Sequence, residues 1–121
     1  MGTKSPSYIN HLAVTLLAAI ALAAHRFVSN DGNYASAVGG AGRDMLGVSE
    51  TDATVGESLS VVVSHSYPVE AAAVIAQWSY VKPDADGRAV VGSLADHCGV
   101  AMTAAQVGEL VEVRLVAHRH A

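Results

Sequence analysis

Hydrophobic residues in this chain fall in short runs separated by turn-forming residues, a pattern typical of a protein built from many short strands. The most regular run is the one in which Leu59, Val61 and Val63 alternate with serines or with a further valine. Alternation with a period of two puts one face of a strand inward and the other outward. A second strand is predicted over Leu110 to Val116, where the alternation is less regular.

The same series of segments occurs twice. Each copy has an Ala-rich segment, an aromatic residue followed by Val, an Asp-Gly turn, a Gly-Val pair and a Gly-Glu-x-x-x-Val run. The first copy is Ala18–Ala24, Phe27-Val28, Asp31-Gly32, Gly47-Val48 and Gly56–Val61, and the second is Ala71–Gln77, Tyr80-Val81, Asp86-Gly87, Gly99-Val100 and Gly108–Val113. A repeat of about fifty residues is usually one unit that cannot bury its apolar face alone. We therefore predict an N-terminal arm (1–11) and a single β-rich domain (12–121), with repeat one at about 12–66 and repeat two at about 67–121.

Further elements follow from local chemistry. Reverse turns are predicted at Asn30–Asn33 and Asp84–Gly87, because Gly adopts a positive φ without steric cost. Returning strands are predicted at Tyr34–Val38 and Arg88–Val91, and short buried strands at Met45–Val48 and Cys98–Ala101. Propensity favours helix in the Ala-rich segments Leu16–Ala24 and Val69–Gln77, whereas the short repeat spacing favours strand-turn structure. The predicted fold is mainly β, a small barrel or sandwich of short strands.

Composition adds an expectation about partners. Half of the residues are hydrophobic, with few aromatic ones, so the core must be built from Val, Leu and Ala. Charged residues make up only 15% of the chain, against about 25% in typical soluble domains. A surface this poor in charge is often covered by a partner, and self-association is the simplest way to provide one.

Charge and cysteine content exclude other classes. The net charge is −4, and no two Lys or Arg residues are adjacent, so no nucleic-acid partner is expected. Cys98 is the only cysteine, which excludes an internal disulfide and a multi-cysteine zinc site. The apolar stretch Leu12–Ala24 resembles part of a secretory signal, but it is too short to span a bilayer. Because a matching stretch, Ala71–Ala76, lies in the middle of the chain, we interpret both as structural elements.

The repeated order of segments resembles the small capsid decoration proteins of tailed bacteriophages, also called cement or head-fibre-like proteins, over most of the chain from Leu12 to Val116. The resemblance implies a β-rich, often trimeric protein that binds the outside of an expanded capsid and stiffens it, with the major capsid protein as its partner. It also implies that the N-terminal arm contacts the shell. The capsid-contact candidates are Lys4, Ser5, Pro6, Ser7, Tyr8, Ile9 and Asn10.

The chain departs from this pattern at three positions. A tight turn before the aromatic-Val strand favours Gly, but His25 and Trp78 occupy that place in the two copies. His65 likewise stands where a small residue is expected. Trp78, Tyr80 and His65 are the candidates for an oligomer interface, because buried aromatic residues dominate such surfaces. An exposed Trp78 and Tyr80 together would instead favour an aromatic platform for sugar.

The residues that could act as catalytic groups match a catalytic arrangement poorly. In Asp96-His97-Cys98, neighbouring side chains on an extended segment point to opposite faces, so His97 is poorly placed to activate Cys98. A buried, inert cysteine is the better interpretation, and a Cys98 hydrolase is the weakest alternative. The acidic residues Glu50, Asp52 and Glu57 are interpreted as a solvated loop. We predict no enzyme activity and no cofactor.

No metal or phosphate site is expected from the sequence. His118 and His120 lie near the carboxyl end without a carboxylate or cysteine, and a solvated tail is favoured there. His11, His25 and His65 are scattered, although a three-fold axis could bring three copies of one histidine together. The loop Gly39–Arg43 lacks the Lys-Ser/Thr ending of a phosphate-binding loop.

These observations predict a non-enzymatic structural protein of the virion that binds the outer surface of a phage capsid as an oligomer. Cementing needs many weak contacts repeated by symmetry, and multivalent attachment supplies avidity without any strong single contact. The alternative is a carbohydrate- or cell-surface-binding β module.

Overall fold

The computed structural model describes residues 12–35 and 44–119. Within these ranges all regular structure is strand, and none of it is a helix of the length and apolarity needed to cross a membrane. The strands are β1 (Ala13–Leu17), β2 (Phe27–Ser29), β3 (Met45–Ser49), β4 (Ser58–Val62), β5 (Ser66–Glu70), β6 (Tyr80–Pro83), β7 (Ala89–Val91), β8 (His97–Ala101) and β9 (Leu110–Arg119).

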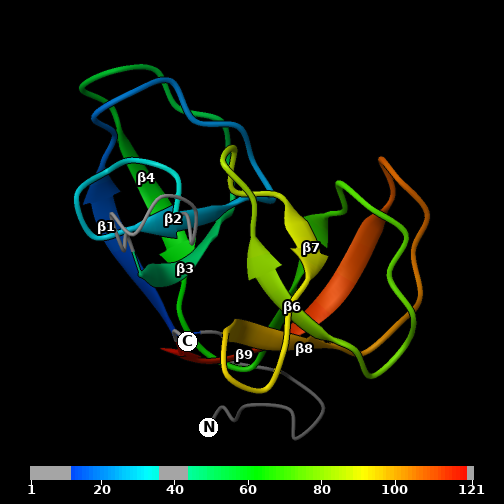
Figure 1. The fold of residues 1–121 in the computed structure, drawn as a ribbon. Coiled ribbons are helices and arrows are strands. Elements are labelled where there is room, and N and C mark those ends of the chain that lie inside the picture. The colour runs from blue at the N-terminus through cyan, green and yellow to red at the C-terminus, as the bar shows by residue number, and fades with distance from the viewer. Residues whose placement is uncertain (1–11, 36–43, 120–121) are drawn as a thin grey trace, which may run out of the picture.

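The strands form two antiparallel sheets that lie side by side in Figure 1. The first has the order β1-β4-β3-β2 and the second the order β5-β9-β8-β6-β7. Neither sheet closes into a barrel within the described residues, and the arrangement is sandwich-like. The predicted β fold is confirmed, and the sandwich is the better of the two alternatives. We call residues 12–64 the four-stranded half and residues 65–119 the five-stranded half.

The two halves make the same backbone hydrogen bonds at matching positions. The N–H of Ala18 donates to the carbonyl of Glu57 (2.9 Å), as that of Ala71 does to Glu109 (2.8 Å). Three further bonds of the four-stranded half also have a match. The bond from Leu22 to Ala53 matches that from Ile75 to Ala105, and the bond from His25 to Ser49 matches that from Trp78 to Ala101. The bond from Glu50 to Ser60 matches that from Met102 to Glu112. The strand order β1-β4-β3-β2 likewise matches β5-β9-β8-β6. The residues of β1, β4, β3 and β2 therefore have structural counterparts in β5, β9, β8 and β6.

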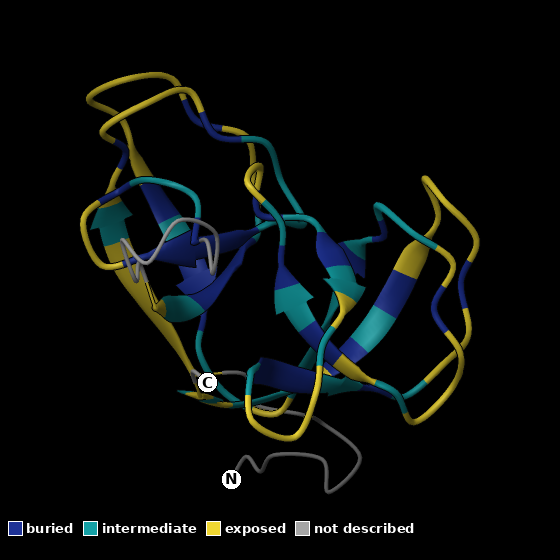
Figure 2. Cartoon of the chain, in the orientation of Figure 1, coloured by how far each residue is buried: buried dark blue, intermediate teal, exposed yellow. Residues whose placement is uncertain are grey.

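The described residues form two apolar cores. One lies within the four-stranded half, and the other fills the five-stranded half and also joins the halves. Leu59, Val61 and Val28 form the centre of the core of the four-stranded half. The larger core contains Val69, Val111 and Val113 of the five-stranded half together with Phe27 and Val48 from β2 and β3. The dark blue segments in Figure 2 follow these strands, and the loops at both ends of the molecule are exposed. The core is thus aliphatic, as the composition predicts.

The Ala-rich segments contain no helix. β1 and β5 begin these segments, and isolated bridges from Leu22 to Ala53 and from Ile75 to Ala105 hold the rest. Strand-turn structure is therefore the correct interpretation, although β5 itself was not predicted. Of the predicted strand Tyr34–Val38, Tyr34 makes only an isolated bridge to Val28, and residues 36–38 lie outside the described ranges.

Positive φ angles occur where the sequence predicts tight turns. Gly32 (φ 83°) and Gly87 (φ 73°) occupy the two predicted Asp-Gly turns. His25 (φ 62°), Trp78 (φ 72°) and His65 (φ 62°) also adopt this conformation, which is costly for a residue with a Cβ atom. The tight turn expected at His25 and Trp78 is confirmed, and His65, at a position where a small residue is expected, has the same geometry. Three non-glycine residues are therefore held in strained backbone.

Candidate interaction surface

The outer face of the five-stranded sheet carries a row of side chains from four strands. Ser66 lies opposite Arg114, Arg114 opposite Val100, and Val100 opposite Tyr80. Directly opposed residues share one face of a sheet. Tyr80 and Arg114 are exposed, and Ser66 and Val100 are half-buried. No carboxylate within 4 Å pairs with Arg114 among the described residues. The exposed Tyr80 and Arg114 make this face a candidate contact surface.

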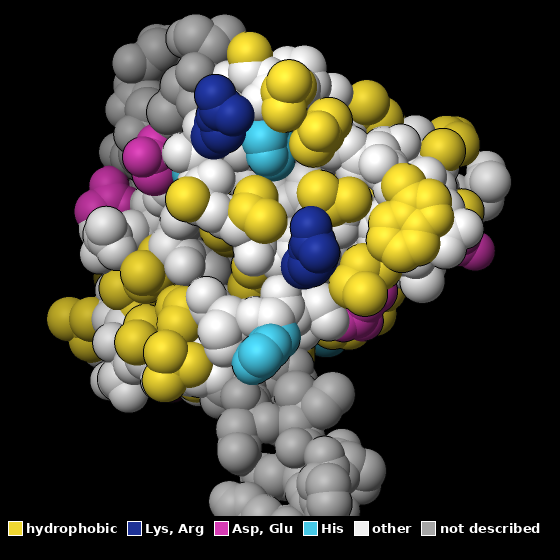
Figure 3. Space-filling view, turned by 90° about the horizontal axis from the view of Figure 1, so that it is seen from below, with side chains coloured by type: hydrophobic (Ala, Val, Ile, Leu, Met, Phe, Trp, Pro, Cys, Tyr) yellow, Lys and Arg dark blue, Asp and Glu magenta, His cyan; other side chains and the backbone are white. Residues whose placement is uncertain are grey.

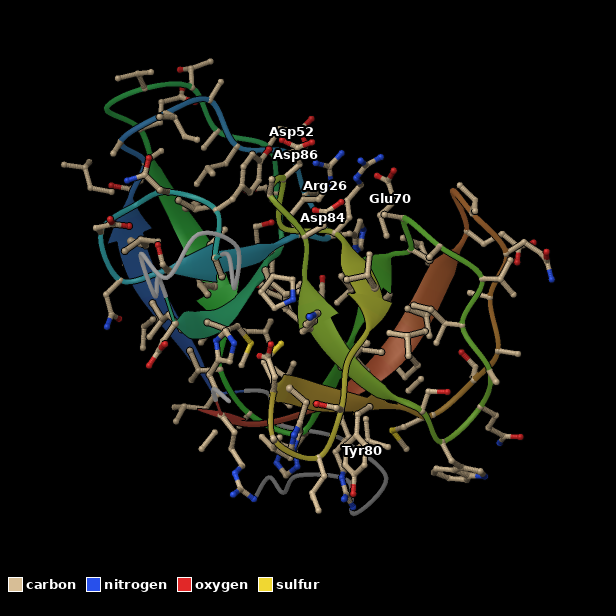
Figure 4. All side chains as sticks on the ribbon, viewed as in Figure 1. Arg26, Asp52, Glu70, Tyr80, Asp84 and Asp86 are labelled. Carbon is tan, nitrogen blue, oxygen red and sulfur yellow. The ribbon has the colours of Figure 1, made fainter. Side chains whose placement is uncertain are left out.

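Trp78 and Tyr80 extend this face at the start of β6. Trp78 is 65% exposed and Tyr80 is 37% exposed. The Tyr80 ring packs on the buried His97 ring, with centroids 4.6 Å apart. Figure 4 shows Tyr80 pointing away from the fold, and the view from below in Figure 3 shows hydrophobic side chains around a few basic ones, with acidic ones toward the edges. The surface is therefore apolar and weakly cationic.

The counterpart of this face in the four-stranded half is fully buried. By the matching of strands, Phe27, Val48 and Val62 correspond to Tyr80, Val100 and Arg114. All three are inaccessible to solvent, and Phe27 and Val48 pack into the core shared with the five-stranded half. The exposed outer face of the five-stranded sheet thus corresponds to a face of the four-stranded sheet that is buried inside the same chain.

A second exposed apolar surface runs along β1, the edge strand of the four-stranded sheet. Leu12 and Leu17 are each 62% exposed, and Val14 is 39% exposed. No residue from Leu12 to Ala24 carries a charge. An uncharged edge strand is a ready template for pairing with another chain, and proteins normally protect such edges.

The structure separates the predicted interface candidates. Trp78 and Tyr80 lie together beside β6, whereas the exposed His65 precedes β5 at the opposite edge of the sheet. Together they do not form one patch. The capsid-contact candidates Lys4 to Asn10 lie outside the described residues.

Cys98 is buried and chemically passive. It is inaccessible to solvent, and burial raises the pKa of its thiol far above the ordinary value. His97 Nδ1 donates to the backbone carbonyls of Ser93 (3.0 Å) and Leu94 (3.1 Å), and Asp96 pairs with Lys82 (3.4 Å). These groups stabilise the loop before β8, as expected for an inert cysteine.

The acidic loop residues also have structural partners. A hydrogen bond from the Thr54 N–H to Glu57 Oε1 (2.8 Å) lowers the pKa of this carboxyl group. The Asp52 carboxylate accepts from the Ala24 N–H (2.8 Å). The hollow that these two residues line with Tyr34 is shallow. Both carboxylates bond to loop backbone and are exposed, as a solvated loop implies, whereas Glu50 is half-buried directly after β3.

The remaining histidine and glycine candidates form no site in the described ranges. His118 Nδ1 accepts a hydrogen bond from the Met45 N–H (2.8 Å), so it contributes to the contact between the halves. Groups of three or more potential metal ligands are absent among the described residues. His11, His120 and the Gly39–Arg43 loop lie outside them.

A charged cluster at the junction of the halves was missed by the sequence analysis. Arg26 Nη2 pairs with Glu70 Oε1 (3.2 Å), and Arg26 Nη1 donates to the Asp86 carbonyl (3.1 Å). Arg88 pairs with Asp84 (3.4 Å) and Asp86 (3.7 Å). Figure 4 shows Arg26, Glu70, Asp84 and Asp86 close together where the two halves meet. Their spacing in the sequence gives no signal, because only the fold brings Arg26 beside Glu70.

The geometry defines the class of the molecule: an all-β protein whose distinctive feature is apolar surface open to partners, without a catalytic cluster among the described residues. A model of the phage cement protein family matches residues 8–116. The chain therefore belongs to the phage cement protein family, and it is a structural protein of the capsid exterior of the virion.

Solved structures agree on the fold. The chain is similar to the "head fiber gp8.5 N base in bacteriophage phi29", with a TM-score of 0.71 and 19% sequence identity. The match covers 91% of this chain and 98% of the other. The comparison with curated proteins found no match. The resemblance on which the sequence analysis relied is confirmed.

Proposed function

We propose that this protein binds the outer surface of a phage capsid as a homotrimer and stabilises the shell, with the major capsid protein as its partner. Membership of the cement family supports the capsid partner. The observation that carries the oligomer is the pair of exposed apolar surfaces, one around Trp78 and Tyr80 and one along β1. No catalytic role is proposed.

We further propose that the arm, residues Gly2 to Asn10, makes the contact with the shell. The test is co-sedimentation of the purified protein with expanded capsids that lack it, followed by thermal disruption of the decorated capsids. The full chain is expected to co-sediment and to raise the disruption temperature. A variant lacking Gly2 to Asn10 should keep the fold and lose most of the binding. Equal binding by the truncated variant would remove the arm from the account.

A carbohydrate-binding module is the second candidate, because Trp78 and Tyr80 are both exposed. Aromatic rings on a surface can stack against sugars, but the Tyr80 ring already packs on His97 with one of its sides. Trp78 is the only tryptophan, so its fluorescence reports directly on this surface. A blue shift on adding an oligosaccharide supports this candidate, and a blue shift with protein concentration alone supports self-association.

A further inference from the structure

The junction between the two halves offers a template for a contact between copies. Within the chain, His25 of the four-stranded half docks on the outer edge of β5. Its carbonyl accepts from the Glu70 N–H (2.9 Å), its Nδ1 donates to the Pro68 carbonyl (3.0 Å), and its ring stacks on Tyr67 (5.6 Å between centroids). Phe27 then enters the core of the five-stranded half, and its N–H donates to the Gly87 carbonyl (2.7 Å).

Trp78 is the counterpart of His25. The Trp78 N–H donates to Ala101 (2.7 Å) as the His25 N–H donates to Ser49 (2.9 Å), and both residues have a positive φ. His25 uses this strained backbone to present its carbonyl and ring to β5. Trp78 has the same backbone conformation. Its ring, however, is largely exposed, and its carbonyl accepts no hydrogen bond from a described residue. Among the described residues, nothing contacts the carbonyl that this strained backbone presents, which suggests a partner outside them.

The counterpart of the β5 edge, on which His25 docks, is the outer edge of β1. Ala18 and Ala71 are counterparts, so Leu17 corresponds to Glu70 and, counting back along the strands, Val14 corresponds to Tyr67. The Ala18 N–H points to Glu57, and N–H groups alternate along a strand, so the Leu17 N–H points out of the sheet edge. Glu70 uses this same N–H to bind His25. On β1, the Ala19 N–H next along this edge donates to the Gly32 carbonyl (2.9 Å), but no described residue accepts from the Leu17 N–H, and Leu17 and Val14 are apolar and exposed.

We propose that a second copy of this chain fills both openings, with Trp78 of one copy docked on β1 of the next as His25 docks on β5. The Trp78 carbonyl would accept from Leu17, its ring would pack on Val14, and Tyr80 would be covered as Phe27 is. This inference rests on the proposed oligomer and specifies its interface. Because the contact is head-to-tail, identical copies close into a ring when the rotation allows it.

Two features favour a second copy over other occupants. The ends of a stack of repeats are normally capped by polar surface, whereas both ends here are apolar. The ion pair between Arg26 and Glu70 is also replaced by Ser79 and Leu17 at the matching positions. Both sides of the contact have thus changed from charged to uncharged residues. Arg114, the counterpart of the buried Val62, marks the rim, because an unpaired guanidinium is costly to bury.

The test is cross-linking of cysteine variants with a short bis-maleimide. Leu17→Cys and Ser79→Cys occupy the counterparts of Glu70 and Arg26, and the buried Cys98 should not react. Neither single variant is expected to form covalent dimers. In the double variant, most of the protein should be cross-linked into covalent oligomers. Leu17→Cys combined with Val107→Cys, which is equally exposed on a remote loop, is the control.

The outcomes separate this inference from the proposed function. If the wild-type protein is an oligomer but the double variant does not cross-link, or Leu17→Cys alone forms dimers, the head-to-tail interface is wrong and the oligomer stands. If the wild-type protein is a monomer, both are wrong. As a readout without substitution, Trp78 fluorescence should shift to the red on dilution at the concentration where the mass falls. An oligomer that dissociates with no change in Trp78 emission would also overturn the interface.

Discussion

Phe27 tests whether the two halves are held together by the shared core. Its side chain is inaccessible to solvent and packs among residues of the five-stranded half. Truncation of a buried Phe to Ala typically costs about 3–5 kcal/mol, from lost transfer energy and the cavity left behind. A domain of this size has a total stability of only about 5–15 kcal/mol. The Phe27→Ala variant should therefore be close to unfolding.

Urea unfolding followed by circular dichroism and by Trp78 fluorescence measures this loss. The matched control is Tyr80→Ala, the counterpart position, where the side chain is partly exposed and the cost in a dilute monomer should be clearly smaller. The control should instead weaken self-association at high concentration. A loss below about 1 kcal/mol for Phe27→Ala, well under the cost of truncating a buried Phe, would show that Phe27 does not hold the halves together.

Three further predictions follow from named residues. Cys98 should resist iodoacetamide in the folded protein and react rapidly in denaturant, because burial raises the pKa of its thiol; rapid labelling under native conditions would contradict its placement in the core. The pKa of Glu57 is lowered from its ordinary value of 4.5, so its stabilising bond to Thr54 is present above that pH and lost as the pH falls through the folded-state value. Thermal melts of wild type and Glu57→Gln should accordingly differ near neutral pH and converge in acid, and a difference that grows in acid would refute this. Gly108→Ala should lower the stability by about 1–2 kcal/mol, because Gly108 has a φ of 87°; the matching variant Gly56→Ala (φ 86°) should lose a similar amount in the same urea titration, and an unchanged midpoint for either would show that the turn relaxes.

Much of the fold could be predicted because its signals are local. Alternation identified β4 and β9, and Asp-Gly turns identified the positive φ angles at Gly32 and Gly87. Gly47 and Gly99 permit close approach of β4 and β9, where an added Cβ would meet the Val62 carbonyl and the Val113 side chain. β5 escaped prediction, because it contains Pro68 and lies at a sheet edge, where Pro is tolerated but the strand signal is weak.

The candidate surface was only half predictable. Trp78 and Tyr80 are conspicuous in a chain with few aromatic residues, and their exposure favours a role in contact. Their complement on β1 was hidden, because an Ala-rich apolar stretch reads equally as signal, helix or core. The junction of Arg26 with Glu70 was also invisible, because residues far apart in the sequence meet only when the two halves pack.

The central claim is that the protein works as an oligomer built from its exposed apolar surfaces. The most direct measurement is the mass in solution by light scattering on a sizing column at micromolar concentration. We expect a stable species of three times the 12.4 kDa chain mass, reduced to a single chain by Trp78→Asp or by Leu17→Asp. A wild-type species of 12.4 kDa would contradict the claim.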